Sequence, residues 1–273
     1  MVMPELPEVE TTKRGIENHL IGKKINRVVI RESRFRWPIN RGFRQKVDGH
    51  IVRAISRRAK YILFQLDHGY FMIHLGMSGN LRIVNANTAI KKHDHVDFQL
   101  ATGKCLRFND PRRFGSVLWL GSSPFEHPLL SKLGPEPFDQ SFNGEYLFQR
   151  ARKKKIAVKN FIMDNHIVVG AGNIYANEAL FISGIRPTRP AGKVTKAECQ
   201  ALVEAIIMVL KASIEMGGTT LKDFVGGDGK PGYFQQTLRV YDREQQPCRK
   251  CNTPIKALRI GQRSSYYCPH CQK

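Results

Sequence analysis

The sequence predicts an α+β fold, with strands in the first half of the chain and helices in most of the second. Three observations predict it. Apolar and polar residues alternate through much of 24–121, and many of the apolar ones are β-branched or aromatic. From residue 143 to 217 the apolar residues recur at helical spacing instead. Four of the six cysteines then lie between 248 and 271 and mark a small C-terminal unit.

A helix is expected before the first strand. Pro7 should occupy its first position, where the missing backbone N–H of proline costs nothing, and Gly22 should end it. One face of this helix collects residues at helical spacing: Val9, Thr12, Ile16 and Leu20. We therefore expect the chain to be anchored very close to its N-terminus.

The strand region is divided by turn residues. Segments with a period of two are separated by glycine, asparagine and aspartate, and they cover 24–30, 51–67, 70–84, 95–110 and 116–121. Short alternating segments at this spacing are typical of an all-β unit. The first half is therefore predicted to be a β-sandwich or barrel.

The second half follows a linker at 133–139, where two prolines and a glycine oppose regular structure. Helices are predicted over 143–154 and 173–183, and a capping box of Thr195 and Glu198 should begin a long helix that ends at Gly217. Residues 217–235 hold seven glycines or prolines and no periodicity, as in a functional or disordered loop. We expect three domains, at residues 1–135, 136–240 and 241–273.

The charge balance indicates a polyanionic partner. The chain has 44 lysines and arginines against 23 aspartates and glutamates, a formal charge of +21. Nucleic acid is the first candidate. An anionic membrane is the rival, but no apolar run approaches about 18 residues and the basic residues are dispersed. The first turn is acidic, unlike a signal peptide, so we expect a cytoplasmic protein that does not bind membranes.

The C-terminal cysteines have the spacing of a metal site. Cys248 and Cys251 form one C-x2-C pair, and Cys268 and Cys271 form another after sixteen residues. Four thiolates make a closed tetrahedral zinc site with no open position, so one structural Zn²⁺ is predicted on a two-stranded ribbon. Arg263 lies near the tip of that ribbon, either as a solvated turn residue or, as the charge favours, as a phosphate contact. The isolated Cys105 and Cys199 are expected to be packing residues.

Three further positions carry candidate chemistry. In "DPRRFG" (110–115), Phe114 beside two arginines suits insertion into a base stack, although it could equally pack inward. The same two alternatives apply to Met77 in "HLGMSG". Lys60 falls inside a strand pattern, either as a residue at a sheet edge or as a buried amine that moves protons.

The opening "MVMPELPEVE" offers a nucleophile. If Met3 were the start and were removed, Pro4 would be a free secondary amine beside the carboxyl group of Glu5. An α-amine titrates near ~8, below lysine at ~10.4, so more of it is unprotonated at neutral pH. Such an amine can attack C1′ of a sugar and form an iminium intermediate.

These segments together resemble one family. "PELPEVETTKRGI", "RRAKY", "HLGMSG", "KHDHVD", "DPRRFG", "LGPEP", "VGAGNIYANEALF", "GGTTLKDF" and the four-cysteine ribbon are similar to bacterial formamidopyrimidine-DNA glycosylases from Pro4 to the C-terminus. The resemblance implies an N-terminal β-sandwich, a helix-two-turn-helix domain and a zinc ribbon. It also implies removal of 8-oxoguanine and formamidopyrimidines from double-stranded DNA by a monomer in the nucleoid, followed by cleavage at the abasic site.

The resemblance also implies residue roles. Pro4 would be the Schiff-base nucleophile and Glu5 the acid that assists sugar opening, with Lys60 and Arg263 as the acids of β- and δ-elimination. Residues that would contact DNA are His93, Arg112, Lys154 and Asn173, and those that would fill the space left by the extruded nucleotide are Met77, Arg112 and Phe114. Residues 217–238 would cover the damaged base, which must leave the helix before chemistry can reach it.

The sequence departs from the family pattern at two places, and two alternative functions stay open. Met1 and Val2 precede the expected start, and Asn160 stands where the family often has proline, which should alter helix entry but not chemistry. An endonuclease VIII-like enzyme for oxidised pyrimidines is less consistent with the "PELPEVE" opening and the long 217–235 loop. A non-catalytic binder of damaged DNA fits only if Pro4 stays joined to Met3.

Overall fold

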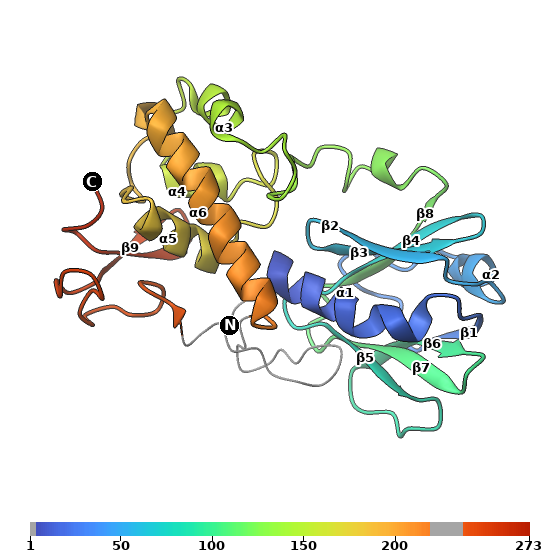
Figure 1. The fold of residues 1–273 in the computed structure, drawn as a ribbon. Helices are drawn as coiled ribbons and strands as arrows, with labels where there is room; N and C mark the ends of the chain where they lie inside the picture. Colours follow the sequence, from blue (N-terminus) through green and yellow to red (C-terminus); the bar gives the residue numbers. More distant parts are fainter. Residues whose placement is uncertain (1–3, 219–236) are drawn as a thin grey trace. The chain divides into compact units, whose positions relative to one another are not determined.

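The computed structural model describes residues 4–218 and 237–273, which form two compact units (Figure 1). Unit 1 contains residues 4–131 and 216–218, and unit 2 contains residues 132–215 and 237–273. The cysteine ribbon therefore belongs to the same compact unit as the helices. The predicted domain boundaries at 135/136 and 240/241 stay a prediction. Most of the predicted base-covering loop, 219–236, lies outside the described residues.

Helix α1 (Leu6–Leu20) opens unit 1. Glu5 is its N-cap, and a capping box joins Glu5 and Glu8, with the Glu5 backbone N–H donating to Glu8 Oε2 at 2.9 Å. Pro7 lies at the second helical position, one later than expected, because Leu6 already has helical geometry. The predicted face is buried, and Gly22 follows the helix with φ 75°. The anchoring of the N-terminus is confirmed by these bonds.

Unit 1 is a sandwich of two four-stranded antiparallel sheets. Their strand orders are β1-β6-β7-β5 and β2-β3-β4-β8. The strands are β1 (Ile25–Ile30), β2 (Ala54–Arg58), β3 (Tyr61–Leu66), β4 (Gly69–His74), β5 (Asn80–Asn85), β6 (Asp94–Leu100), β7 (Lys104–Asn109) and β8 (Ser116–Gly121). Short helices α2 (Phe43–Val47) and η1 (Pro124–Glu126) complete it.

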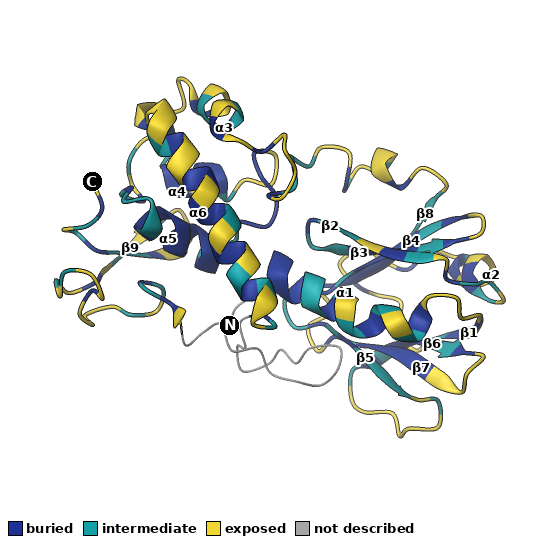
Figure 2. Cartoon of the chain, viewed as in Figure 1, coloured by how far each residue is buried: buried dark blue, intermediate teal, exposed yellow. Residues whose placement is uncertain are grey.

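Aromatic rings fill the space between the sheets. Phe71 of β4 stacks on Phe98 of β6 with ring centroids 5.2 Å apart, and on Phe64 of β3 at 4.5 Å. All three side chains are fully buried. In Figure 2, stretches of dark blue mark the buried residues along the strands of unit 1. Because the rings of one sheet meet those of the other, the structure is a sandwich rather than a barrel.

A buried ion pair crosses β6 and β7. Arg107 donates to both oxygens of Asp97, from Nε at 2.9 Å and from Nη2 at 3.0 Å, and both side chains are 2% exposed. Arg31 donates to the same carboxylate. Burial alone would raise the pKa of Asp97, but the hydrogen bonds and charges of these two arginines lower it below its usual range. The pair is therefore charged and fully hydrogen-bonded.

Asp97→Asn should destabilise the protein by about 3–5 kcal/mol, because it removes the hydrogen-bonded counter-charge of the buried Arg107 guanidinium and leaves it only the Asp94 carboxylate at 3.6 Å. Urea unfolding would measure the change, with Asp67→Asn, at an exposed pair with Arg53, as a control costing about 1 kcal/mol or less. Folding lowers the pKa of Asp97 below its ordinary value of 3.8. The contribution of Asp97 to stability is therefore complete above pH 3.8, and it is lost as the pH falls through the lower pKa of the folded state. An equal loss in both variants, or one that persists below that pH, would contradict this account.

Unit 2 is built from four helices: α3 (Gly144–Ala151), α4 (Val158–Ile162), α5 (Asn173–Ile182) and α6 (Lys196–Glu215), with the short η2 (Ala191–Lys193). The helix predicted over 143–154 ends early, since Lys153 adopts φ 62°. The capping box before α6 is confirmed, because Thr195 N–H donates to Glu198 Oε2 at 2.8 Å and Glu198 N–H donates to Thr195 Oγ1 at 3.3 Å. In the part of the chain that the structure describes, no helix has both the length and the apolar character needed to cross a bilayer.

The ribbon, β9 (Lys256–Ile260) and β10 (Arg263–Tyr267), is bonded to the helices by buried polar side chains. Lys159 Nζ donates to Ser264 O and Ser265 Oγ, both at 2.7 Å. Asn177 Oδ1 accepts from the Tyr266 N–H at 2.8 Å. Because Lys159 and Asn177 are fully buried, these bonds fix the ribbon on α4 and α5.

Candidate functional site

The N-terminus and the Lys60 turn are linked through an ion pair. Pro4 and Glu5 are buried, with Glu5 3% exposed. Lys60 lies in the two-residue turn between β2 and β3, not inside a strand as its pattern suggested, because Ala59 adopts φ 53° and reverses the chain. Arg57 donates to Ala59 O at 3.0 Å and to Glu10 Oε2 of α1 at 3.0 Å. The helix that carries Glu5 is therefore bonded to the turn that carries Lys60.

His74 is neutral beside this turn. Burial, together with the positive charges of Lys60 and Arg36, lowers the pKa of His74 to about 4. Its Nδ1 accepts from the Gly76 N–H at 3.0 Å, so Nε2 carries the proton. His74 thus adds no charge near Lys60 at neutral pH and holds the start of the next loop.

Two loops of unit 1 bring the predicted intercalating residues together. Loop 75–79 carries Met77, which is half-buried, and loop 110–115 carries Arg112 and Phe114. Phe114 is 42% exposed, and the Arg112 guanidinium lies over its ring at 4.8 Å from the centroid. Phe114 therefore points outward, which favours the intercalating role over inward packing.

Phe114→Ala should slow base excision from duplex DNA by about tenfold or more and leave excision from a single-stranded lesion nearly unchanged. The reason is that only a duplex has a stack to open, which costs a few kcal/mol per step. Single-turnover rates on the two substrates measure the difference. Phe125→Ala, at another exposed phenylalanine of unit 1, is the matched control. Equal losses on both substrates would instead mark Phe114 as a residue needed for folding.

His93 lies at the same end of unit 1. It precedes β6 in the left-handed conformation, with φ 71°, and its carbonyl accepts from the Asp110 N–H at 3.1 Å. The structure thus gathers four predicted DNA-contacting residues of unit 1 on neighbouring loops: Met77, His93, Arg112 and Phe114.

The remaining predicted DNA contacts lie in unit 2. Lys154 is exposed, in a turn after α3. Asn173 is the first residue of α5, where the predicted helix begins, and its Oδ1 is buried without a hydrogen-bond partner among the described residues. Arg263 is exposed at the start of β10.

Asn160 is the third residue of α4 and lies beside the ribbon tip, where a Cβ added to Gly261 would be 3.4 Å from Asn160 Nδ2.

The four C-terminal cysteines form a zinc site. Their Sγ atoms all lie within 4.8 Å of one another. Cys251 Sγ is 3.4 Å from the sulfurs of Cys268 and Cys271, and Cys248 and Cys271 are separated by 3.9 Å. A tetrahedron of sulfurs about 2.3 Å from zinc has edges of about 3.8 Å, so the residues fit Zn²⁺. Four thiolates complete the coordination, and the site is structural.

The two remaining cysteines are packing residues, as expected. Cys105 is fully buried in β7 and Cys199 is 1% exposed in α6. Burial raises the pKa of Cys105 to about 12 and that of Cys199 to about 11. Both thiols are protonated at neutral pH and therefore poor nucleophiles.

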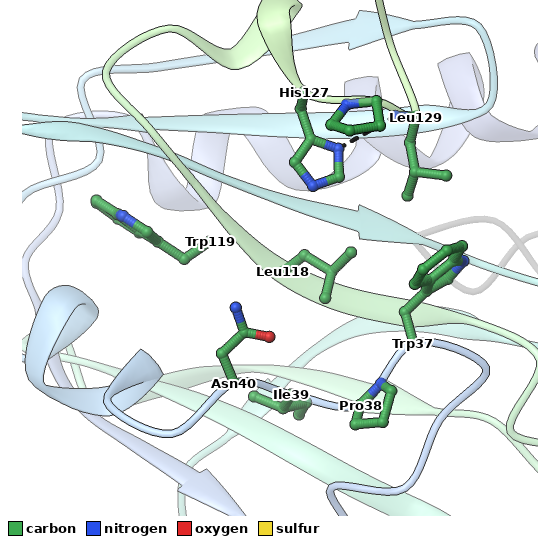
Figure 3. Close-up of a pocket in the computed structure, with 9 residues that line it drawn as sticks. Trp37, Pro38, Ile39, Asn40, Leu118, Trp119, His127 and Leu129 are labelled. Atoms are coloured by element: carbon green, nitrogen blue, oxygen red, sulfur yellow. Dashed lines mark hydrogen bonds between the residues drawn. The ribbon is translucent and has the colours of Figure 1, made fainter.

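Unit 1 also contains an apolar pocket of about 450 Å³ (Figure 3). In this view Leu118 of β8 lies at the centre, with His127 and Leu129 above it, Trp37 and Pro38 to its right and Trp119 to its left. Burial lowers the pKa of His127, and the other lining residues are of uncharged types. Within the described structure, none of the predicted site residues lines it.

Three family profiles match the chain in sequence order. Residues 3–117 match the formamidopyrimidine-DNA glycosylase N-terminal domain, residues 133–225 match the formamidopyrimidine-DNA glycosylase H2TH domain, and residues 245–273 match the zinc finger found in FPG and IleRS. This combination of a β-sandwich, H2TH helices and a cysteine zinc finger defines a class of DNA repair glycosylases.

Individual relatives agree over the whole length. Formamidopyrimidine-DNA glycosylases of Alcanivorax borkumensis and Thioalkalivibrio sulfidiphilus are 58% and 54% identical, each over 99% of this chain and 100% of the relative. A solved complex of a Lactococcus lactis FPG mutant with Fapy-dG-containing DNA is 29% identical with a TM-score of 0.91, covering 99% of this chain and 100% of that one. The MutM (FPG) protein of Thermus thermophilus is 36% identical with a TM-score of 0.88, covering 98% of both chains. The chain belongs to the formamidopyrimidine-DNA glycosylase family.

Proposed function

We propose that the protein is a base-excision-repair glycosylase that removes 8-oxoguanine and formamidopyrimidines from double-stranded DNA and then cleaves the strand at the abasic site. The grouping of an outward Phe114 with Met77 and Arg112 carries the proposal, because an enzyme that acts on a stacked base must open the duplex. A formal charge of +21 supports binding to the phosphate backbone. The Lactococcus lactis complex with Fapy-dG DNA supports the substrate class.

The proposed chemistry begins at the N-terminus. A free Pro4 amine attacks C1′ of the damaged nucleotide, the bond from C1′ to the base breaks, and the base leaves with a proton. This step leaves the Pro4 nitrogen bonded to C1′ of the closed sugar. Glu5, at the N-cap of α1, lies next in the chain and would protonate O4′ as the C1′–O4′ bond breaks, which opens the ring and leaves an iminium that joins protein and sugar. Zinc supplies no reaction step, since its role is to hold the ribbon.

Elimination then breaks the DNA backbone on both sides of the sugar. Lys60 would transfer the proton in β-elimination, and Arg263 would act in δ-elimination. Lys60→Ala should therefore slow strand cleavage more than base release, whereas Arg263→Ala should leave the β-elimination product in place of the δ product. Gel separation of the two products measures this. A Lys60 variant that cleaves and releases base at wild-type rates would remove Lys60 from the mechanism.

A comparison of lesions tests the proposed function. A duplex with 8-oxoguanine opposite cytosine should be cleaved fastest. A duplex with an oxidised pyrimidine should be cleaved more slowly, and an undamaged duplex should not be cleaved. Preference for the oxidised pyrimidine would place the enzyme with endonuclease VIII-like activities. Tight binding of damaged DNA without any excision would make it a binding protein. We also propose that it acts as a monomer in the cytoplasm, on DNA of the nucleoid.

A further inference from the structure

Asp110 is a fully buried carboxylate between the loops that carry Met77 and Phe114. It is the first residue of loop 110–115. Its Oδ2 accepts from the Gly115 N–H at 2.8 Å, and its Oδ1 accepts from the Arg112 N–H at 3.3 Å. These two bonds close the loop on itself, with Arg112 and Phe114 on the part that is held.

The same carboxylate reaches the loop that carries Met77. Ser78 Oγ donates to Asp110 Oδ1 at 3.0 Å. The two loops also touch through their backbones, since a Cβ added to Gly76 would lie 2.4 Å from the Gly115 nitrogen, and Gly76 has φ 67°. Loops 75–79 and 110–115 are therefore joined both by a side chain and by direct contact.

The main chain of Asp110 contacts the segment that carries His93 and the start of β6. Its N–H donates to His93 O at 3.1 Å, and its carbonyl oxygen lies 3.0 Å from His95 Nε2. One buried residue thus makes hydrogen bonds to all three segments that hold the predicted DNA contacts of unit 1.

We infer that Asp110 is a positioning residue that fixes the Met77 and Phe114 loops in one geometry, so that both side chains enter the DNA stack together. The inference rests on the proposed function. Opening a stack already costs free energy, and ordering a loose loop at the same moment would add an entropy cost. Hydrogen bonds made before DNA arrives remove that second cost. A carboxylate suits the position because its oxygens only accept, and the groups around it donate.

Ser78→Ala tests the link most directly, because it removes only the bond between the Met77 loop and Asp110. Single-turnover excision from an 8-oxoguanine duplex should fall about fivefold, the effect of one hydrogen bond, while excision from the same strand without its complement stays unchanged. Ser122→Ala, at an exposed serine after β8, is the matched control and should alter neither rate. An unchanged ratio of the two rates in Ser78→Ala, or equal losses on both substrates, would overturn the inference.

Two further variants sharpen the test. Asp110→Asn turns an NH2 group toward a backbone N–H and should lower the ratio of duplex to single-strand excision by about tenfold or more. In a Met77→Ala background, Ser78→Ala should have no further effect, because the loop no longer carries the side chain that must be placed. If Asp110→Asn fails to fold, the double-mutant cycle of Ser78→Ala and Met77→Ala still tests the inference. Additive losses of the excision rate in that cycle would contradict it. A folded wild-type protein that excises from neither substrate would overturn the proposed function itself, which these variants do not address.

Discussion

Protein that begins at Pro4 should be trapped on 8-oxoguanine duplex by borohydride as one covalent adduct, and protein that begins at Val2 should give none. In the second form the Pro4 nitrogen is an amide, whose lone pair is delocalised into the carbonyl group and cannot attack C1′. The expected difference is from complete trapping to none that can be detected. Mass spectrometry of each preparation before the assay defines its first residue, since Met1–Met3 lie outside the described part of the chain.

Two variants serve as controls for this experiment. Pro4→Gly keeps a free α-amine but changes its basicity and its fixed backbone angle, so trapping should weaken without disappearing. Glu5→Gln keeps the shape of the side chain but removes the proposed acid, so base excision should be lost. Trapping on undamaged DNA equal to that on damaged DNA would contradict the lesion specificity. Full activity from homogeneous protein that begins at Val2 would require another nucleophile, and Lys60 would be the first to examine.

Loss of zinc should abolish DNA binding, not only the elimination steps. Cys251→Ser removes one of four ligands, and structural zinc sites contribute about 10–16 kcal/mol of apparent binding free energy at neutral pH. Without the folded ribbon, Arg263 is no longer held in position to contact DNA. The buried Asn177 Oδ1 also loses the hydrogen bond that it accepts from the Tyr266 N–H. Fluorescence anisotropy with lesion DNA, together with the zinc content of the protein, measures both effects.

Cys199→Ala is the matched control, because Cys199 is a buried thiol far in sequence from the zinc ligands. It should keep one zinc per chain and bind DNA at wild-type affinity. Arg263→Ala is a second comparison, since it alters the tip and leaves the metal site whole. Zinc-free protein that bound lesion DNA at full affinity would show that the ribbon is dispensable for recognition.

Much of the fold could be predicted because local patterns dictated it. Alternation of apolar residues marked the strands, the Thr195 and Glu198 pair marked the start of α6, and two C-x2-C pairs marked the metal site. Each of these signals lies within a few residues of the feature that it predicts. Alternation alone could not separate a sandwich from a barrel, because the stacking of Phe71 on Phe98 joins residues distant in the chain; the family resemblance implied the sandwich, and the structure confirms it.

The candidate site was only partly predictable for the same reason. Lys60 looked like a strand residue because apolar residues flank it, yet the left-handed Ala59 places it in a turn. Asp110 and Ser78 lie inside "DPRRFG" and "HLGMSG", but their hydrogen bond spans 32 residues. Arg57 and Glu10 form their ion pair across 47. Long-range bonds of this kind leave no period or spacing in the sequence that could reveal them.

The ribbon follows the helices that it bonds to in the chain, and this order affects synthesis on the ribosome. Residues 4–131 of unit 1 emerge first and can fold while translation continues. Helices α4 and α5 emerge next, but Ser264, Ser265 and Tyr266, to which Lys159 and Asn177 bond, follow 89 to 106 residues later. Unit 2 can therefore close only after the ribbon has left the ribosome. A product truncated before the ribbon would keep a folded sandwich, but the polar groups of α4 and α5 that bond to the ribbon would be exposed. Such a product should be degraded by quality-control proteases.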